Sequence, residues 1–409
     1  MNISRRMGHV RWGLALVTGL IILLILMAFF YRPDYYRASA VPMTSTVQLT
    51  PNTARLPGKN VFEVSVSVSQ IVYPATFVDN KPKAVILVPR GDWRRSLVAA
   101  NVIHFPVDAP ILYIENNSIP DIVKKEIKRL DPEGLFVDGN VKAFIVGSVD
   151  QKIKDELHSL KMKFRQFEAE SVYDLAALID QYRATINSDH NDMVMIASDV
   201  SPEYAIYSAS WTAHAGSPTF FVSKDEIPDA TRKALSRRPQ DAFIYLLGNE
   251  KVISQKIAAE LGRYGHVQRI PGKDSFDMSA GFAGYADLGP NLGYWIAKTI
   301  RMFGWGISEA GHNFIFVNPD QPEMAIPAGI LSHRGKHGPM LLVKEDSIPQ
   351  PVLRYLKVVQ PAYLSEQEQL FNYGWIIGGS ETISSKIQKD IDKLLRVKMP
   401  AQASEGDNA

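Results

Sequence analysis

The chain has 409 residues, which is enough for two to four domains at the usual size of about 150 residues each. Its 45 lysines and arginines nearly balance 43 aspartates and glutamates, for a net charge of +2. Because a dedicated nucleic-acid-binding protein normally carries a concentrated basic stripe, this balance argues against a nucleic-acid partner. The absence of cysteine excludes disulfides, thiolate catalysis and cysteine-ligated zinc.

The first predicted element is a membrane anchor in residues 12–30, a run of apolar or small residues without a charge. As a helix it would be about 28 Å long, close to the thickness of about 30 Å of the hydrocarbon core of a bilayer. Three arginines precede this run, so the positive-inside rule predicts a cytoplasmic N-terminus and an exported remainder. The start of the chain is therefore interpreted as a cytoplasmic tail (1–11), a transmembrane anchor (12–31) and a linker (32–54).

A cleaved signal peptide is the alternative interpretation of the same segment. Ala38 and Ala40 form an A-x-A cleavage pattern. However, residues 31–40 separate this pattern from the apolar run with several charges, and the run is longer than the usual apolar core of about 7–15 residues. We favour an uncleaved anchor.

The rest of the chain contains a short sequence phrase that occurs in three similar copies. Its middle copy reads KDEIPDATRKAL, and its proline aligns the three copies. Ten residues before that proline lies a second one, and an apolar run begins 26 residues before the second proline. Shared spacings of this kind indicate a repeated unit. The aligned features are the phrase prolines Pro120, Pro228 and Pro349, the earlier prolines Pro110, Pro218 and Pro339, and the runs 84–88, 192–196 and 313–317.

Each copy continues with an apolar strand that ends in glycine and then with an amphipathic helix. Strands that alternate with helices predict βαβ units, in which a mainly parallel sheet is covered by helices. The repeated phrase is then a strand-to-helix junction with proline in the first helical turn, where its missing N–H needs no partner. Ser118, Asn117 and Ser347 are the predicted helix caps.

The units are placed at residues 55–164, 165–267 and 268–396, followed by a disordered tail (397–409). The third unit contains an insertion (285–313), of which residues 293–305 are predicted to form an amphipathic helix. Three roles are open for the insertion: packing across a unit boundary, contacting the membrane, or docking a partner. We favour packing.

Residues 61–73 give conflicting signals. Valine alternates with polar residues there, which favours a strand. The corresponding segments of the other units, 172–182 and 276–286, have a helical pattern. Because the units are repeats, we predict a helix in all three.

The motifs together resemble the type 2 cell wall-binding repeats, a family with three tandem units on exported bacterial proteins. The resemblance covers residues 55–396 and is carried by RIPGKDSF (269–276), its copy RLPGKNVF (55–62), the segment 198–222, the KDEIPDATRKAL phrase and IIGGSETIS (376–384). It implies Rossmann-like three-layer α/β units around a pseudo-threefold axis. It also implies a non-catalytic protein that holds an anionic secondary polymer of the cell wall.

The first unit departs from the family pattern. Its loop 89–97, PRGDWRRSL, is bulky and basic and has no Pro-Glu pair, whereas the others have Pro202-Glu203 and Pro322-Glu323. The departure predicts either a different ligand specificity or a loss of binding in this unit.

Anionic polymers are held by cationic side chains and backbone N–H groups, so the candidate ligand-binding residues are basic. Arg90, Arg94 and Arg95 follow the first main strand, at the end where open α/β sheets bind ligands. The alternative is that these are surface charges or ion pairs, each contributing about 0–1 kcal/mol. The other candidates occupy matching places in different units: Lys59 and Lys273, Arg55 and Arg269, and Lys224 and Lys344.

No metal, cofactor or catalytic residue is predicted. The glycine turns at Gly147, Gly248 and Gly378 fit neither a P-loop nor a GxGxxG fingerprint. His333 and His337 have a metal-like spacing but no HExxH motif or aligned carboxylate. GxSxG is absent, although paired carboxylates of a glycosidase would leave no local signature.

The sequence therefore predicts a single-pass membrane protein whose three α/β repeats face the cell wall. We expect non-catalytic binding of a teichoic-acid-like polymer or secondary polysaccharide. An extracytoplasmic scaffold for an envelope protein partner is the alternative, and an envelope enzyme without a recognisable motif is the third possibility.

Overall fold

The computed structural model describes residues 48–287, 303–334, 336–365 and 367–399. Within these ranges no helix combines the length and the apolar character needed to cross a bilayer. The predicted anchor, most of the helix predicted in the insertion, and residues 400–409 of the predicted tail lie outside the described residues.

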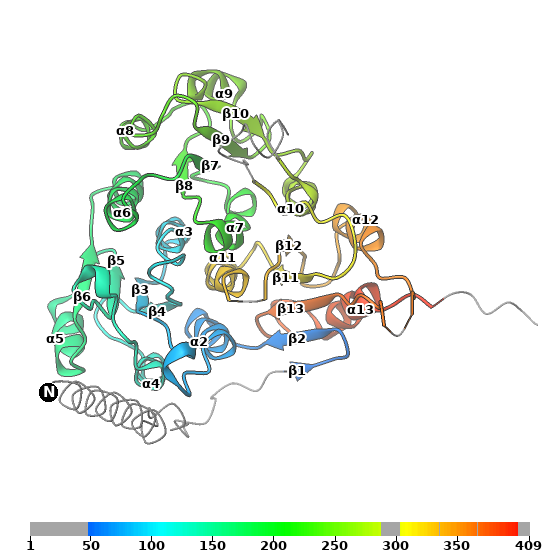
Figure 1. Cartoon of the computed structure of the whole chain (residues 1–409), viewed down its shortest axis with the longest axis horizontal. Helices are drawn as coiled ribbons and strands as arrows, with labels where there is room; N and C mark the ends of the chain where they lie inside the picture. The colour runs from blue at the N-terminus through cyan, green and yellow to red at the C-terminus, as the bar shows by residue number, and fades with distance from the viewer. Residues whose placement is uncertain (1–47, 288–302, 335, 366, 400–409) are drawn as a thin grey trace, which may run out of the picture.

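Three sheets organise the described chain, as predicted for an α/β protein with mainly parallel strands (Figure 1). Strand β1 pairs antiparallel with β2, and the other strand pairs within the described ranges are parallel. The first sheet has the order β4 (Ile111–Ile114), β3 (Val85–Pro89), β5 (Ala143–Val146) and β6 (Phe164–Phe167). The second has the order β10 (His266–Arg269), β9 (Phe243–Leu247), β7 (Met193–Ser198) and β8 (Thr219–Val222). The third has the order β1 (Gln48–Leu49), β2 (Thr53–Leu56), β13 (Tyr373–Ile377), β11 (Asn313–Val317) and β12 (Met340–Leu342).

The strand that opens each repeat pairs with the sheet of another repeat. Strand β6 pairs with β5 of the first sheet, and β10 pairs with β9 of the second. Strand β2 pairs with β13, near the other end of the chain, which closes the three sheets into a ring. The helices that follow these strands pack on the next sheet along: α2 (Val61–Val72) on β4, α6 (Val172–Asn187) on β8, and α10 (Ser275–Gly284) on β12.

Segment 61–73 is helical, as the repeat pattern predicted. Its valines and serines are both buried from Val64 to Ser69, so the helix is enclosed on all sides rather than amphipathic. The serine hydroxyls are satisfied internally, for example Ser67 Oγ by the carbonyl of Pro57 at 2.7 Å. The alternating pattern therefore comes from small polar residues that allow close packing, and not from a strand with one solvent-exposed face.

Three corresponding helices meet at the centre of the molecule (Figure 1). Helices α3 (Trp93–Ala100), α7 (Ser208–Ala215) and α11 (Pro322–Ala325) follow the strands β3, β7 and β11, and the 3-10 helix η4 (Ile326–Ser332) continues α11. A Cβ at Gly329 would lie 2.7 Å from the carbonyl oxygen of Ala209, so glycine permits this close approach of η4 to α7.

The repeated strand-to-helix junctions have the same backbone in all three copies. Pro120, Pro228 and Pro349 have φ of −57°, −59° and −56° and ψ of 147°, 146° and 144°. Each is the N-cap residue, one position earlier than predicted. The predicted side-chain caps do not form, because proline has no side-chain acceptor at the N-cap position.

The predicted equal spacing between the main strand and the earlier proline (Pro110, Pro218 or Pro339) needs correction. The strand residue that donates its N–H to the earlier proline is one residue closer to that proline in the second repeat than in the others. The bonds are Ile86 to Pro110 at 2.8 Å, Met195 to Pro218 at 2.9 Å, and Ile315 to Pro339 at 2.9 Å.

The two described ends of the predicted insertion pack against β9 and α7. Asp287 and Phe303 form an antiparallel bridge, and the ring of Phe303 stacks on Tyr245 of β9 with 3.4 Å between centroids. Trp305 contacts Trp211 of α7. The remaining α-helices are α4 (Asp121–Leu130), α5 (Gln151–Ser159), α8 (Asp229–Leu235), α9 (Gln255–Leu261), α12 (Gln350–Val358) and α13 (Ser385–Leu395). The short 3-10 helices are η1 (Val78–Asn80), η2 (Phe136–Asp138) and η3 (Pro202–Tyr204).

Candidate functional site

A cleft of about 310 Å³ opens at the carboxyl ends of the first sheet's strands. Two of the predicted arginines, Arg94 and Arg95, lie in its wall, and we call it the Arg94–Arg95 cleft. It is bounded by the start of α3, the turn after β5 and the start of α6. The lining residues are Asp92, Arg94, Arg95, Gly147, Ser148, Ala169, Glu170, Ser171, Val172, Tyr173 and Leu175.

Asp92 orients both arginines. It is the N-cap of α3, and its carboxylate accepts the Arg94 backbone N–H at 3.1 Å. The same carboxylate lies 3.1 Å from Arg94 Nε and 3.9 Å from Arg95 Nη2. One carboxylate cannot occupy all the donors of two guanidinium groups, so donors remain for an anion that enters the cleft.

The glycine turn after β5 makes room for Arg95. Gly147 has φ of +115°, and a Cβ there would meet Arg95 Cδ at 2.7 Å. Any larger residue would therefore be strained and would displace the Arg95 side chain from the turn.

Tyr173 joins the cleft to the second sheet. Its hydroxyl donates to Asp199 Oδ2 at 2.5 Å, on the loop after β7. Burial and this hydrogen bond raise the pKa of Tyr173 to about 12, so the phenol stays protonated near neutral pH. The cleft wall thus offers hydroxyl and carboxylate groups beside the two arginines.

Arg90 lies apart from the cleft lining. Its Nε pairs with Glu115 Oε1 at 2.8 Å, and its guanidinium stands 5.7 Å from the centre of the Phe62 ring. The structure therefore brings Arg94 and Arg95 together and directs Arg90 toward β4 and α2.

Arg55 and Arg269 are used inside the fold. Arg55 is 1% exposed and donates to the carbonyls of Gly378 at 2.9 Å and Gly379 at 2.8 Å. Arg269 donates to the carbonyl of Gly248 in the corresponding place. Burial lowers the pKa of both guanidinium groups, because desolvation disfavours the charged form.

The matching arginines therefore recur for an architectural reason. Each arginine lies on a strand that opens a predicted repeat, β2 or β10, and each donates to the glycine turn of the sheet that this strand joins. In the first sheet Gln166 has this role, because its Nε2 donates to the carbonyl of Gly147 at 3.0 Å.

The four candidate lysines are exposed at the edges of the second and third sheets, outside the lining of the Arg94–Arg95 cleft. The backbone N–H groups of Lys59 and Lys273 donate to the carboxylates of Glu63 and Asp277 at 3.0 and 2.9 Å. The carbonyl of Lys224 accepts the N–H of Ser254 at 3.0 Å. The Lys344 ammonium stands 5.7 Å from the centre of the Phe276 ring.

The corresponding places in the other two sheets are crossed by side chains. Asn249 Nδ2 donates to Tyr204 Oη at 3.1 Å and to the carbonyl of Lys273 at 2.9 Å. In the third sheet Asn318 Nδ2 donates to the carbonyl of Thr382 at 2.9 Å. The first sheet therefore has an open cleft where side chains cross the corresponding places of the other two sheets. The sequence signal for this difference was the bulky, basic loop 89–97.

Glu323 anchors that basic loop from the third repeat. Its carboxylate accepts the N–H of Gly91 at 2.9 and 3.1 Å and the hydroxyl of Ser96 at 3.3 Å. Burial raises the pKa of Glu323 above its ordinary value. The Pro-Glu pair was visible in the sequence, but its partner is more than two hundred residues away and carried no local sign.

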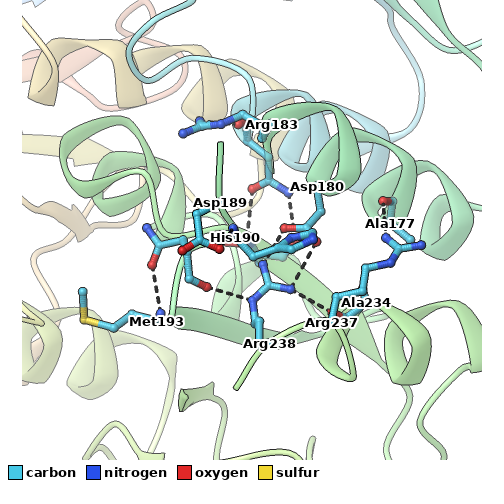
Figure 2. A network of polar contacts seen from close by, with 12 residues as sticks. Ala177, Asp180, Arg183, Asp189, His190, Met193, Ala234, Arg237 and Arg238 are labelled. Atoms are coloured by element: carbon cyan, nitrogen blue, oxygen red, sulfur yellow. Dashed lines mark hydrogen bonds and ion pairs between the residues drawn. The ribbon is translucent and has the colours of Figure 1, made fainter. Parts of the chain in front are cut away.

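A second polar cluster, which the sequence did not reveal, lies between α6 and the end of α8 (Figure 2). Asp180 pairs with Arg238, with 3.1 Å from Oδ2 to Nη1, and lies 3.2 Å from His190 Nδ1. Arg238 Nε also donates to the carbonyl of Asn191 at 2.8 Å. The adjoining cavity of about 20 Å³ has room for roughly one water, so the cluster supports the fold rather than a ligand.

Four histidines near the molecular centre form a third cluster, the central histidine cluster. His104 and His333 face each other at 5.3 Å between ring centroids, and His214 and His337 at 4.8 Å. Burial lowers the pKa of His104 to about 4, aided by Arg183 and His333. Burial and His337 lower the pKa of His214 as well. Within the described ranges, no three histidine or acidic side chains are grouped so that they could hold a metal ion.

Comparison with known proteins finds solved structures that share the fold. No family model matches the chain. The amidase enhancer of Bacillus subtilis (strain 168) is 19% identical over 310 residues, which are 76% of this chain and 37% of that protein. Cwp6 from Clostridium difficile superposes with a TM-score of 0.64 at 17% identity, over 89% of this chain and 51% of that one. Cwp8 from the same organism superposes with a TM-score of 0.62 at 18% identity, over 85% and 52%. The chain thus spans about a third of the amidase enhancer and half of each Cwp chain, and shares its fold with both Cwp structures.

Proposed function

We propose that the chain is a non-catalytic protein of the cell envelope that binds an anionic wall polymer in the Arg94–Arg95 cleft. The observation that carries the proposal is the pair of arginines held side by side at the carboxyl edge of a parallel sheet. Ligands of open α/β sheets bind at this edge. The shared fold with the C. difficile cell wall proteins Cwp6 and Cwp8 supports a place at the wall.

The cleft suits a polymer in which phosphate groups alternate with hydroxyl-bearing units. Free donors of Arg94 and Arg95 match phosphate oxygens. Asp92, Glu170 and the nearby hydroxyls match the hydroxyl groups of a sugar or polyol. Because the lining carries both signs of charge, a repeating sugar or polyol phosphate fits it better than a uniformly charged chain.

The overall arrangement belongs to the same proposal. We infer three Rossmann-like three-layer units, related by a pseudo-threefold axis through the three central helices, which are carried outside the cell by an N-terminal anchor. The matching junction prolines and central helices support the repeated unit. Sequencing the N-terminus of the mature protein tests the anchor, since cleavage after Ala40 would remove it.

Charge reversal in the cleft tests the binding. We expect retention of the double variant Arg94→Glu/Arg95→Glu on immobilised teichoic acid to fall at least about tenfold. The reason is that the two changes replace two charge-assisted contacts by repulsion. The measurement is retention of the full chain in detergent at low and high salt, and retention by the native chain should fall with salt. Arg263→Glu, an exposed charge outside the cleft, is the matched control. Equal retention by the double variant and the control would contradict the proposal.

A second candidate function is the regulation of an envelope enzyme through protein contact. The name of the B. subtilis relative, amidase enhancer, favours it. Co-purification of an envelope hydrolase with the full chain, without retention of polymer, would support this alternative. Hydrolysis of a glycan or peptide panel by the chain itself would contradict the non-catalytic proposal.

A further inference from the structure

The Arg94–Arg95 cleft carries opposite charges on different walls. Arg94 and Arg95 extend from the start of α3, and Asp92 is the carboxylate that lies beside both guanidinium groups. Glu170 lines the cleft from the loop between β6 and α6. Two guanidinium groups beside one carboxylate leave the α3 wall positive, whereas Glu170 makes the wall at the start of α6 negative.

The carboxylate of Glu170 is free within the described ranges. Its side chain is exposed, and neither a hydrogen bond nor an ion pair engages it there. The neighbouring acidic side chains do have partners. Glu168 accepts a hydrogen bond from Gln166 Nε2 at 3.0 Å, and Asp174 accepts one from the hydroxyl of Ser171. The loop therefore presents one unengaged carboxylate to the cleft.

The negative side of the cleft continues to the second sheet. Tyr173 lines the cleft and donates its hydroxyl to Asp199 Oδ2. Asp199 is 8% exposed, and its Oδ1 is buried without a hydrogen-bond partner in the part of the chain that the structure describes. Burial raises the pKa of Tyr173, the charges of Asp199 and Glu226 raise it further, and the charge of Arg94 opposes them. Tyr173 therefore lies where the field of the carboxylates meets that of the arginines.

The open cleft keeps the two signs of charge apart. It has a volume of about 310 Å³, and no ion pair joins Glu170 to either arginine within the described ranges. A phosphate matches the guanidinium donors, and an ammonium matches a free carboxylate. A ligand with charges of one sign would be attracted by one wall and repelled by the other. The cleft therefore suits a ligand that carries both signs.

We propose that the polymer held in the Arg94–Arg95 cleft is zwitterionic, with a phosphate at Arg94 and Arg95 and an ammonium group at Glu170. The inference rests on the polymer binding of the proposed function and names the substituent that the cleft selects. A hydroxyl can also donate to Glu170, but an ammonium group adds the charge that neutralises it. Glu170 is then the residue that determines specificity.

One polymer with and without its amines tests the inference. The full chain in detergent is applied to immobilised teichoic acid that carries alanyl esters, and to the same polymer after mild alkali has removed these esters. We expect retention on the esterified polymer to be at least about threefold stronger, because each ester supplies an ammonium group for Glu170. Attraction to anions alone gives the opposite order, since the esters lower the net negative charge of the polymer. Equal or weaker retention on the esterified polymer would overturn the proposal.

A single substitution assigns the preference to its residue. Glu170→Gln should abolish the difference between the two polymers. It should also raise retention on the polymer without esters, because it removes a negative charge from the cleft. Glu250→Gln, at an exposed glutamate after β9, is the matched control and should keep the native preference. A preference that survives in Glu170→Gln would contradict the role of Glu170.

The outcomes distinguish this inference from the proposed function. A native chain that is retained on both polymers without preference refutes the zwitterionic ligand alone, whereas a chain retained on neither also refutes the proposed function. Phosphatidylethanolamine carries the same two charges in its headgroup. Adding it to the detergent should leave the chain on the esterified polymer. Release that depends on Glu170 would assign the cleft to a lipid headgroup and overturn the proposal.

Discussion

At the scale of single residues, the arginines of this protein fall into two classes according to what their side chains contact. Arg94 and Arg95 keep donors that face a cleft, whereas Arg55 and Arg269 donate theirs to backbone carbonyls. Burial, not residue type, makes this division, because a buried guanidinium must satisfy its donors inside the fold. Arginine is suited to both tasks, since its donors form a planar fork with a fixed geometry.

A residue-scale prediction concerns the buried pair in Figure 2. Asp180→Ala should lower the free energy of unfolding by about 3–5 kcal/mol, because it leaves Arg238 charged and unpaired in the interior. Urea unfolding at neutral pH measures the change. Asp229→Ala, at an exposed carboxylate beside Arg232, is the control and should change stability by less than about 1 kcal/mol. A loss of the same size in both variants would refute the role assigned to burial.

At the scale of elements, the strand that opens each predicted repeat and the helix after it connect two sheets. The strand completes one sheet, while the helix after it packs on the next sheet. Arg55 secures β2 in the third sheet, and Gln166 does the same for β6 in the first with a neutral amide. The three sheets are therefore linked through the strand-helix pairs β2–α2, β6–α6 and β10–α10 as well as by contacts between surfaces.

This arrangement predicts a graded effect at position 55. Arg55→Ala should destabilise the protein by about 2–4 kcal/mol, since buried carbonyls of Gly378 and Gly379 lose their donor. Arg55→Gln should lose less, because glutamine has the same role at position 166. Hydrogen exchange of the β2 and β13 amides, together with urea unfolding, measures both variants. Equal losses in the two variants would argue that the charge, and not the hydrogen bond, is what matters.

For the whole molecule, we expect the centre where α3, α7 and α11 meet to be sensitive to acid. The folded state holds the pKa of His104 at about 4, below the value of about 6.5 in an unfolded chain. Below pH 6.5 the unfolded chain therefore binds more protons than the folded one, and stability falls as the pH is lowered toward 4. On one side Asp108 pairs with Arg334 and lies 3.1 Å from His333 Nε2, whereas the charge of Arg183 opposes protonation of His104.

The expected outcome is a loss of up to about 3 kcal/mol of stability between pH 7 and pH 4 that is attributable to His104. Thermal unfolding of His104→Gln should show a shallower dependence on pH than that of the native chain. His158→Gln, at an exposed histidine, should keep the native profile. If His104→Gln fails to fold, His214→Gln provides the same comparison, because burial lowers the pKa of His214 too. Identical profiles in all variants would contradict the prediction.

The sequence by itself determined the local elements of this protein. Proline restricts φ, and apolar runs specify buried strands, so the junctions at Pro120, Pro228 and Pro349 and the mainly parallel α/β class could be predicted from neighbouring residues. The helical nature of residues 61–73 followed from comparison between repeats, against the local pattern.

Only the tertiary structure decided which sheet each opening strand joins and which arginines face solvent. Arg55 meets Gln388, and Glu323 meets Gly91, across intervals of more than two hundred residues. Local propensity contains no information about such contacts, because they depend on how completed sheets and helices pack around one centre. For the same reason the basic loop could be recognised in the sequence, but its division into Arg94 and Arg95 in the cleft and Arg90 outside it could not.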